Sequence, residues 1–151
     1  MHPGQLREWI IRPTLKRIGH YSRSAEELLM LTAATESVMG KYIHQVGGPA
    51  LGIYQMEPAT ARDIWANYLA YKRPLADEIR NWGEGPGPLP GNLYYATAMA
   101  RVHYLRVPEG LPSAMDEWGL AKYWKDHYNT HLGKGTVEKA VEMYREYAIV
   151  D

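Results

Sequence analysis

The sequence predicts an α+β domain that is mainly α-helical, on the strength of three observations. Apolar residues recur at helical spacing in most of the chain, and helix-capping residues precede several of these segments. Between residues 41 and 56, three glycines and one proline exclude a continuous helix, so a small β-like or irregular lobe is expected there. The length of 151 residues predicts a single domain over residues 1–151 that buries its own core.

Two helices are expected before the lobe. The first should run from Gln5 to about Ile18, with Pro13 kinking it or dividing it in two. The second should begin at a capping box, because Ser24 is followed three residues later by Glu27.

This second helix should end at Met39, since Gly40 can adopt the left-handed conformation that stops a helix. After the lobe, Pro58 suits the first turn of a helix that ends near Tyr71. Four glycines and three prolines between residues 83 and 91 predict a surface loop within the same domain.

Three helices are expected in the last third of the chain, two of them preceded by a capping residue. Asn92 should cap a helix that reaches Arg106. A further helix is expected from Ala114 to Leu132, and Thr136 should cap the last one.

Composition excludes several classes of function. Lys and Arg together number 17, as do Asp and Glu, so the overall charge gives no reason to expect nucleic acid as a partner. No apolar run approaches the roughly 20 residues of a membrane span, and no secretory signal follows Met1. The chain lacks cysteine, which excludes disulfides and thiolate metal sites. With 12 Tyr, 5 Trp and no Phe, its rings all carry a polar group, which is compatible with stacking on sugars.

Glu36 is the strongest candidate for a catalytic group. It follows an apolar helix pattern, and the stretch from Ser37 to Met56 contains no Asp or Glu. Partial burial without nearby carboxylates would raise its pKa, as a general acid working near neutral pH requires. An exposed glutamate at a helix end is the alternative interpretation.

Three motifs in a fixed order resemble the lysozyme-like lytic transglycosylases, in particular the phage-encoded members. The family's hallmarks are a Glu-Ser pair, then Gly-Leu-Met-Gln, then Tyr-Asn. The resemblance extends over most of the chain, and the motifs here read Glu36-Ser37, Gly52-Ile53-Tyr54-Gln55 and Tyr128-Asn129.

The resemblance implies a lysozyme-like domain in which the small lobe forms one wall of a cleft beside the catalytic helix. It implies that Glu36 first protonates the glycosidic oxygen between N-acetylmuramic acid and N-acetylglucosamine of peptidoglycan. The same residue would then act as base for attack by the muramoyl 6-hydroxyl, giving a 1,6-anhydro product.

The remaining motif residues are expected to bind substrate. Ser37 would orient or polarise Glu36 or the sugar, with capping of the helix end as the alternative. The amide of Gln55 suits an N-acetyl group or a ring hydroxyl. Tyr54, where the family usually has Met, adds a hydroxyl to the same groove. The Tyr128 hydroxyl is expected to hydrogen-bond the acid, and Asn129 would line the groove.

A second carboxylate would favour hydrolysis over transglycosylation. The nearest candidates after Glu36 are Glu57, explained equally well as a helix-start carboxylate, and Asp63, explained as a surface charge. A hydrolytic muramidase is therefore one alternative function, and a non-catalytic virion or wall-binding protein on the same fold is another.

No cofactor is expected, and no metal site is predicted. His127 and His131 stand four residues apart, a spacing that places two imidazoles on one helix face, but a glutamate does not follow the first of them. The expected partners are peptidoglycan glycan strands and other virion proteins of a phage. The expected location is the virion or the host cell, with the wall reached by a route other than a secretory signal, either at infection or at lysis.

Overall fold

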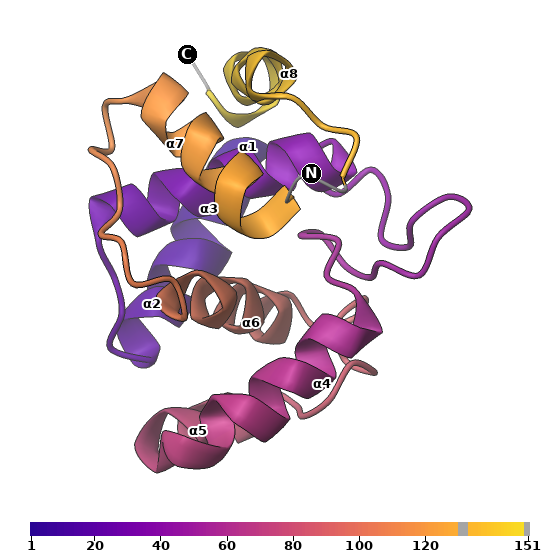
Figure 1. Cartoon of the computed structure of the whole chain (residues 1–151), viewed down its shortest axis with the longest axis vertical. Coiled ribbons are helices and arrows are strands. Elements are labelled where there is room, and N and C mark those ends of the chain that lie inside the picture. The colour runs from indigo at the N-terminus through magenta and orange to yellow at the C-terminus, as the bar shows by residue number, and fades with distance from the viewer. Residues whose placement is uncertain (130–132, 150–151) are drawn as a thin grey trace.

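The chain folds around a set of short helices in the computed structural model, which describes residues 1–129 and 133–149 (Figure 1). The structure is 61% helix and 2% strand, which confirms the mainly helical prediction. Its elements in chain order are α1 (Pro3–Leu6), η1 (Arg7–Ile11), α2 (Arg12–Arg17), α3 (Arg23–Ser37), α4 (Pro58–Asn67), η2 (Leu69–Tyr71), α5 (Arg73–Arg80), α6 (Leu93–Leu105), α7 (Glu117–Trp124), η3 (Lys125–Asn129), α8 (Val137–Met143) and η4 (Tyr144–Ala148). Of the η elements, η2 is a 3₁₀ turn and the others are π-helical turns.

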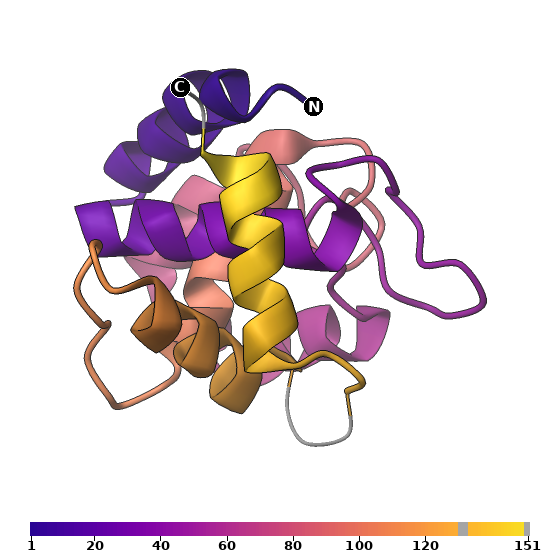
Figure 2. The same cartoon turned by 90° about the horizontal axis from the view of Figure 1, so that it is seen from above.

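Helix α3 is the centre of the molecule. It is buried on nearly all sides, as an apolar helix without a polar face requires, and α6, α7, α8 and η1 pack against it. Figure 2 shows α8 crossing over α3, and Figure 1 shows α4 and α5 forming an arm at one end of the molecule. The last turn of α3 carries Glu36, so the catalytic candidate is held by the most buried element.

The start of α3 differs from the predicted capping box. Ser22, rather than Ser24, caps the helix, and its Oγ accepts a hydrogen bond of 3.0 Å from a backbone N–H three residues on. Glu27 makes tertiary contacts instead: its carboxylate pairs with Arg7 and accepts a 2.6 Å hydrogen bond from the Tyr144 hydroxyl. These contacts are invisible to a local capping rule, which is why the prediction failed by two residues.

The end of α3 is also earlier than predicted. The helix stops at Ser37, and Val38, Met39 and Gly40 follow with φ angles of 53°, 56° and 83°. The Ser37 Oγ accepts a 2.8 Å hydrogen bond from the Gly40 backbone N–H, which closes this left-handed turn. A β-branched residue such as Val38 at positive φ is strained, so the chain stores backbone strain directly beside Glu36.

The lobe at residues 41–56 was predicted to be either β-like or irregular, and the structure shows it to be irregular. Two single antiparallel bridges, His44 with Leu51 and Leu51 with Met56, are the β-structure that the described residues contain. Figures 1 and 2 both show this segment extending from one side of the helical body. Gly52 anchors it, because φ is 83° there and a Cβ would lie 2.6 Å from the Leu89 carbonyl oxygen.

The remaining helices follow the predicted signals with shifted boundaries. The first helical segment begins at Pro3 instead of Gln5, and Pro13 lies at the start of α2, where the π-helical turn η1 passes into an α-helix without a break in the helical backbone. Pro58 opens α4. Asn92 caps α6 and Thr136 caps α8 as predicted.

Two boundaries and one helix were predicted less well, and one further boundary falls outside the described residues. The helix starting at Pro58 ends at Asn67, and only the 3₁₀ turn η2 reaches Tyr71. The short helix α5 was not predicted. Helix α7 begins after Asp116 rather than at Ala114, and Leu132, its predicted end, lies outside the described residues. Within the described part, no helix has the length and apolar character needed to cross a membrane.

Candidate active site

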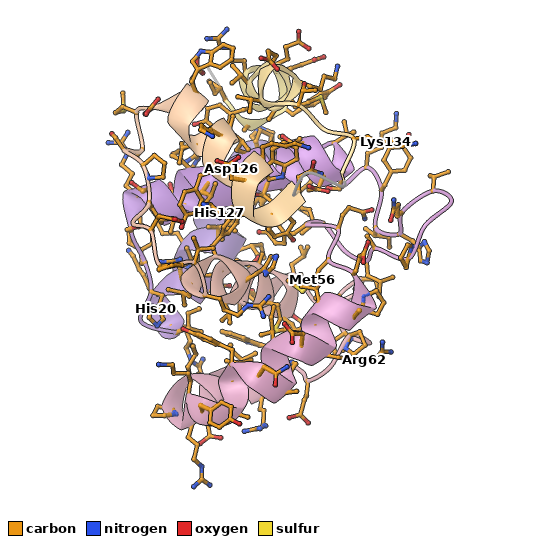
Figure 3. The ribbon with its side chains drawn as sticks, in the orientation of Figure 1. His20, Met56, Arg62, Asp126, His127 and Lys134 are labelled. Atoms are coloured by element: carbon orange, nitrogen blue, oxygen red, sulfur yellow. The ribbon has the colours of Figure 1, made fainter. Side chains whose placement is uncertain are left out.

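A cleft of about 750 Å³ opens between the end of α3, the irregular lobe and the η3 turn. It falls in the size range of typical ligand sites. Figure 3 labels three of its residues, Met56, His127 and Lys134, which come from three separate segments. Of the predicted site residues, the cleft is lined by Glu36, Gln55, Tyr128 and Asn129.

Glu36 is partly buried in the wall of this cleft. Burial raises its pKa from 4.5 to about 7, against the opposing effects of hydrogen bonds from Trp124 and Asn129 and the charge of Lys125. The Trp124 indole Nε1 donates to Glu36 Oε2 over 2.9 Å. A carboxyl group with this pKa is about half protonated at neutral pH, so it can both give and take a proton.

Lys125 determines which end of the Asn129 amide, the oxygen or the nitrogen, is turned toward Glu36. Its ammonium donates to Asn129 Oδ1 over 2.9 Å and to the Gly133 carbonyl oxygen over 3.0 Å. With the amide oxygen engaged by Lys125, the amide nitrogen is the end left to hydrogen-bond Glu36. Sequence reasoning missed Trp124 and Lys125 as partners of the acid. The helical spacing of Lys125 and Asn129, four residues apart, was the available signal.

Ser37 has a structural role. Its side chain is fully buried, and the hydroxyl donates to the Ala33 carbonyl over 3.1 Å while accepting from Gly40. Both contacts belong to the helix end, so the structure corresponds to the capping interpretation. Ser37 is not among the residues that line the cleft, so its buried hydroxyl is not placed to contact a ligand there.

Tyr54 also lies in the core instead of the groove. Its side chain is 1% exposed, and its hydroxyl lies 2.8 Å from Thr97 Oγ1. A Tyr where the family usually has Met therefore finds a buried hydrogen-bond partner on α6. This corrects the expectation that the added hydroxyl contacts the sugar.

Gln55 does face the cleft. Its backbone is left-handed, with φ of 49°, and its Nε2 donates to the Gly52 carbonyl over 2.9 Å. That bond fixes the amide, and no donor within the described residues reaches Oε1. The carbonyl end of Gln55 is thus an available acceptor for a ligand N–H or O–H.

Tyr128 lines the cleft with its ring, while its hydroxyl points elsewhere. The hydroxyl donates to the Tyr54 backbone carbonyl over 2.7 Å and so joins η3 to the lobe. The expected hydrogen bond to Glu36 is replaced by this contact. The ring packs edge-on against His103, with centroids 5.0 Å apart.

The cleft contains a second carboxylate. Glu57 lines it and is exposed, at the junction of the lobe and α4. Asp63, the other sequence candidate, is not a lining residue, and its carboxylate accepts 2.6 Å hydrogen bonds from Arg106 and Asn67. The stretch from Ser37 to Met56 contributes no carboxylate, and of the two candidates that follow it in sequence, Glu57 is the one that reaches the cleft.

The two histidines that stand four residues apart in sequence, His127 and His131, are not seen together at a site within the described residues. His127 lies 3.1 Å from a Glu109 carboxylate oxygen, and His131 lies outside the described residues. Across residues 1–129 and 133–149, no group of three or more His, Cys, Asp or Glu side chains is placed to hold a metal ion.

Comparisons with known proteins identify no relative. No family model matches the chain, and neither a curated protein nor a solved structure matches it.

Proposed function

We propose that this chain is a peptidoglycan lytic transglycosylase with Glu36 as its acid and base. The observation that carries the proposal is the cleft-facing carboxyl group whose pKa burial raises to about 7. The choice of this family is supported by the order of three motifs along the chain, which are Glu36-Ser37, Gly52 to Gln55 and Tyr128-Asn129. The proposal includes a lysozyme-like arrangement, in which α3 carries the acid and the irregular lobe forms the facing wall.

The chemistry needs one proton and no water. Protonated Glu36 gives its proton to the glycosidic oxygen, the bond from C1 of N-acetylmuramic acid breaks, and N-acetylglucosamine leaves as an alcohol. The muramoyl 6-hydroxyl then attacks C1 and returns its proton to the Glu36 carboxylate, which restores the acid. The attacking hydroxyl belongs to the same ring, so positioning the ring supplies much of the rate advantage.

The wall around Glu36 supports both halves of this cycle. The Trp124 indole and the Asn129 amide stabilise the carboxylate after proton transfer, while burial favours the acid before it. Opposed effects of this kind hold a carboxyl pKa near the working pH, where general acid and base catalysis are most effective.

Hydrolysis by the same acid is a second candidate, and the exposed Glu57 in the cleft favours it. A carboxylate across a glycosidic bond from the acid can activate water, as in inverting glycosidases. In a transglycosylase Glu57 would instead only shape the cleft.

Mass spectrometry of digested peptidoglycan separates these functions. Muropeptides ending in 1,6-anhydro-N-acetylmuramic acid, lighter by one water, support the proposal, and reducing ends refute it in favour of the muramidase. The Glu57→Gln variant sharpens the test, since it should retain anhydro products under the first mechanism and lose hydrolysis under the second. No fragments from folded protein on several wall types would indicate a non-catalytic wall-binding protein.

The proposal places the enzyme in a phage virion or in the host cell during lysis. Its support is the resemblance to phage-encoded members, and other virion proteins are the partners it implies. Copurification of the chain with purified phage particles would test the virion location.

A further inference from the structure

His103 lines the cleft from α6, and its hydrogen bond fixes which ring nitrogen carries the proton. The His103 Nδ1 lies 2.8 Å from an Arg106 guanidinium nitrogen, Nη2. A guanidinium group has only donors, so Nδ1 must be the unprotonated acceptor in this contact. In the neutral imidazole the proton is then on Nε2, which becomes a donor.

The guanidinium is itself held in place by a carboxylate from another helix. Arg106 Nη1 donates to Asp63 Oδ2 over 2.6 Å, which joins α6 to α4. Asp63 receives a further hydrogen bond from Asn67 on its own helix. Asp63 and Arg106 thus orient the imidazole with the opposite polarity to a carboxylate: a carboxylate would accept from Nδ1–H, whereas Arg106 donates to Nδ1 and leaves the proton on Nε2.

The ring itself is fixed in position and in charge. It packs edge-on against Tyr128 and tilted against Tyr104, with centroids 5.0 and 6.4 Å apart. Burial, and then the positive charge of Arg106, lower the pKa of His103 to about 4. The imidazole is therefore neutral at neutral pH, and no acceptor within the described residues takes up Nε2.

A neutral donor of this kind selects a particular chemical group. Because Nδ1 is occupied, the side chain can donate to a ligand but cannot accept from it. A hydroxyl group can turn to meet either a donor or an acceptor, whereas an amide carbonyl can only accept. On a 2-acetamido sugar, the acetamido carbonyl is the group that such a donor distinguishes best.

We propose that His103 is a specificity-determining residue whose Nε2–H donates to an acetamido carbonyl of the bound glycan, with Arg106 and Asp63 as positioning residues. This inference rests on the proposed function, because it assumes that a glycan of 2-acetamido sugars occupies the cleft. It assigns a role to a histidine whose spacing in the sequence indicated none.

Binding of a defined oligosaccharide tests the inference without needing turnover. In a Glu36→Gln background, calorimetry gives the Kd for the tetramer of N-acetylglucosamine and for its de-N-acetylated counterpart. A Gln side chain places its amide nitrogen near the position of histidine Nε2, while Asn places it near Nδ1. Added to Glu36→Gln, His103→Gln should therefore leave the Kd for the acetylated tetramer nearly unchanged. His103→Asn in the same background should weaken binding of that tetramer roughly 3- to 10-fold. Neither variant should change the affinity for the de-N-acetylated tetramer.

Imidazole ¹⁵N NMR supplies a readout that a purely structural role would not produce. At neutral pH the parent should show the Nε2–H tautomer of His103. Arg106→Met removes the donor and the cation, so a mixture of tautomers and a raised pKa are expected. An Nδ1–H tautomer in the parent, or equal affinity of folded His103→Asn for the acetylated tetramer, would overturn the inference.

The outcomes also separate this inference from the function on which it rests. If Glu36→Gln binds the acetylated tetramer but substitution of His103 has no effect, only the inference fails. If Glu36→Gln binds neither tetramer, the glycan site itself is wrong, and the inference falls with the proposed function. Melting temperatures of both His103 variants show whether any loss reflects unfolding.

Discussion

Replacing Glu36 with Gln tests the acid through stability as well as through activity. The amide keeps the shape of the side chain and still accepts a hydrogen bond from the Trp124 indole, but it neither gives nor takes a proton. Losing general acid catalysis should reduce peptidoglycan cleavage roughly 10²- to 10⁴-fold. The stability of the same variant reports the pKa directly, without reference to any substrate.

The size of the stability effect follows from the burial of the carboxyl group. Its pKa is about 7 in the folded chain and 4.5 as a reference for the unfolded chain. Between pH 4.5 and about pH 7, Glu36 has lost its proton in the unfolded chain but retains it in the folded chain. The free energy of unfolding therefore falls as the pH rises through this range. The full loss is about 3 kcal/mol, is absent below pH 4.5 and is complete above the folded pKa. Glu36→Gln lacks this loss, so its advantage over the parent should grow across that window.

Urea denaturation of both proteins at a series of pH values measures the difference. Trp124→Phe supplies a comparison in the opposite direction, since removing the indole donor should raise the Glu36 pKa further and extend the window upward. Parallel stability curves for the parent and Glu36→Gln would show that the carboxyl has no raised pKa. The general-acid argument would then lose its physical basis, even if activity were lost.

Three further substitutions give separate tests. Tyr128→Phe should lower the free energy of unfolding by about 1 kcal/mol with little effect on cleavage rate, because the hydroxyl bonds the Tyr54 carbonyl; a large rate loss at unchanged stability would contradict this. Gly52→Ala should destabilise by about 2 kcal/mol or more in chemical denaturation, since a Cβ would meet the Leu89 carbonyl at positive φ. Gly47→Ala, also at positive φ but in open space, is its matched control and should cost less. Asp63→Asn should reduce cleavage far less than Glu36→Gln in the same wall-digestion assay, and a comparable loss would favour a hydrolase with two carboxylates.

Local sequence rules predicted the helices well where one residue decides the outcome. Pro58, Asn92 and Thr136 act through their own backbone geometry or a single side-chain bond, and the structure places each at a helix start. The rules failed where a tertiary contact competes. Glu27 has the spacing of a capping box, yet Arg7 lies close enough to pair with its carboxylate.

The same distinction applies to the site. The apolar helix pattern before Glu36 predicted partial burial, and burial is what raises the pKa of its carboxyl group. Motif matching then assigned substrate contacts to Tyr54 and Ser37, which the structure buries. A motif gives residue types, while burial depends on the direction in which the fold points each side chain and on what packs against it, such as Thr97 against the Tyr54 hydroxyl. Glu57 and His103 reach the cleft from segments whose direction could not be read from spacing alone.

Two ionisable side chains of the cleft, Glu36 and His103, are partly or wholly uncharged at neutral pH. Glu36 is about half protonated at neutral pH, and His103 stays neutral because burial and Arg106 lower its pKa to about 4. The guanidinium that causes this shift is neutralised by Asp63 on its far side. Other ionisable side chains lie close by: the charge of Lys125 lowers the pKa of Glu36, and Glu57 and Lys134 also line the cleft. If a glycan of 2-acetamido sugars binds there, as proposed, a neutral His103 suits ring hydroxyls and acetamido groups, and burial keeps part of the Glu36 population protonated near neutral pH.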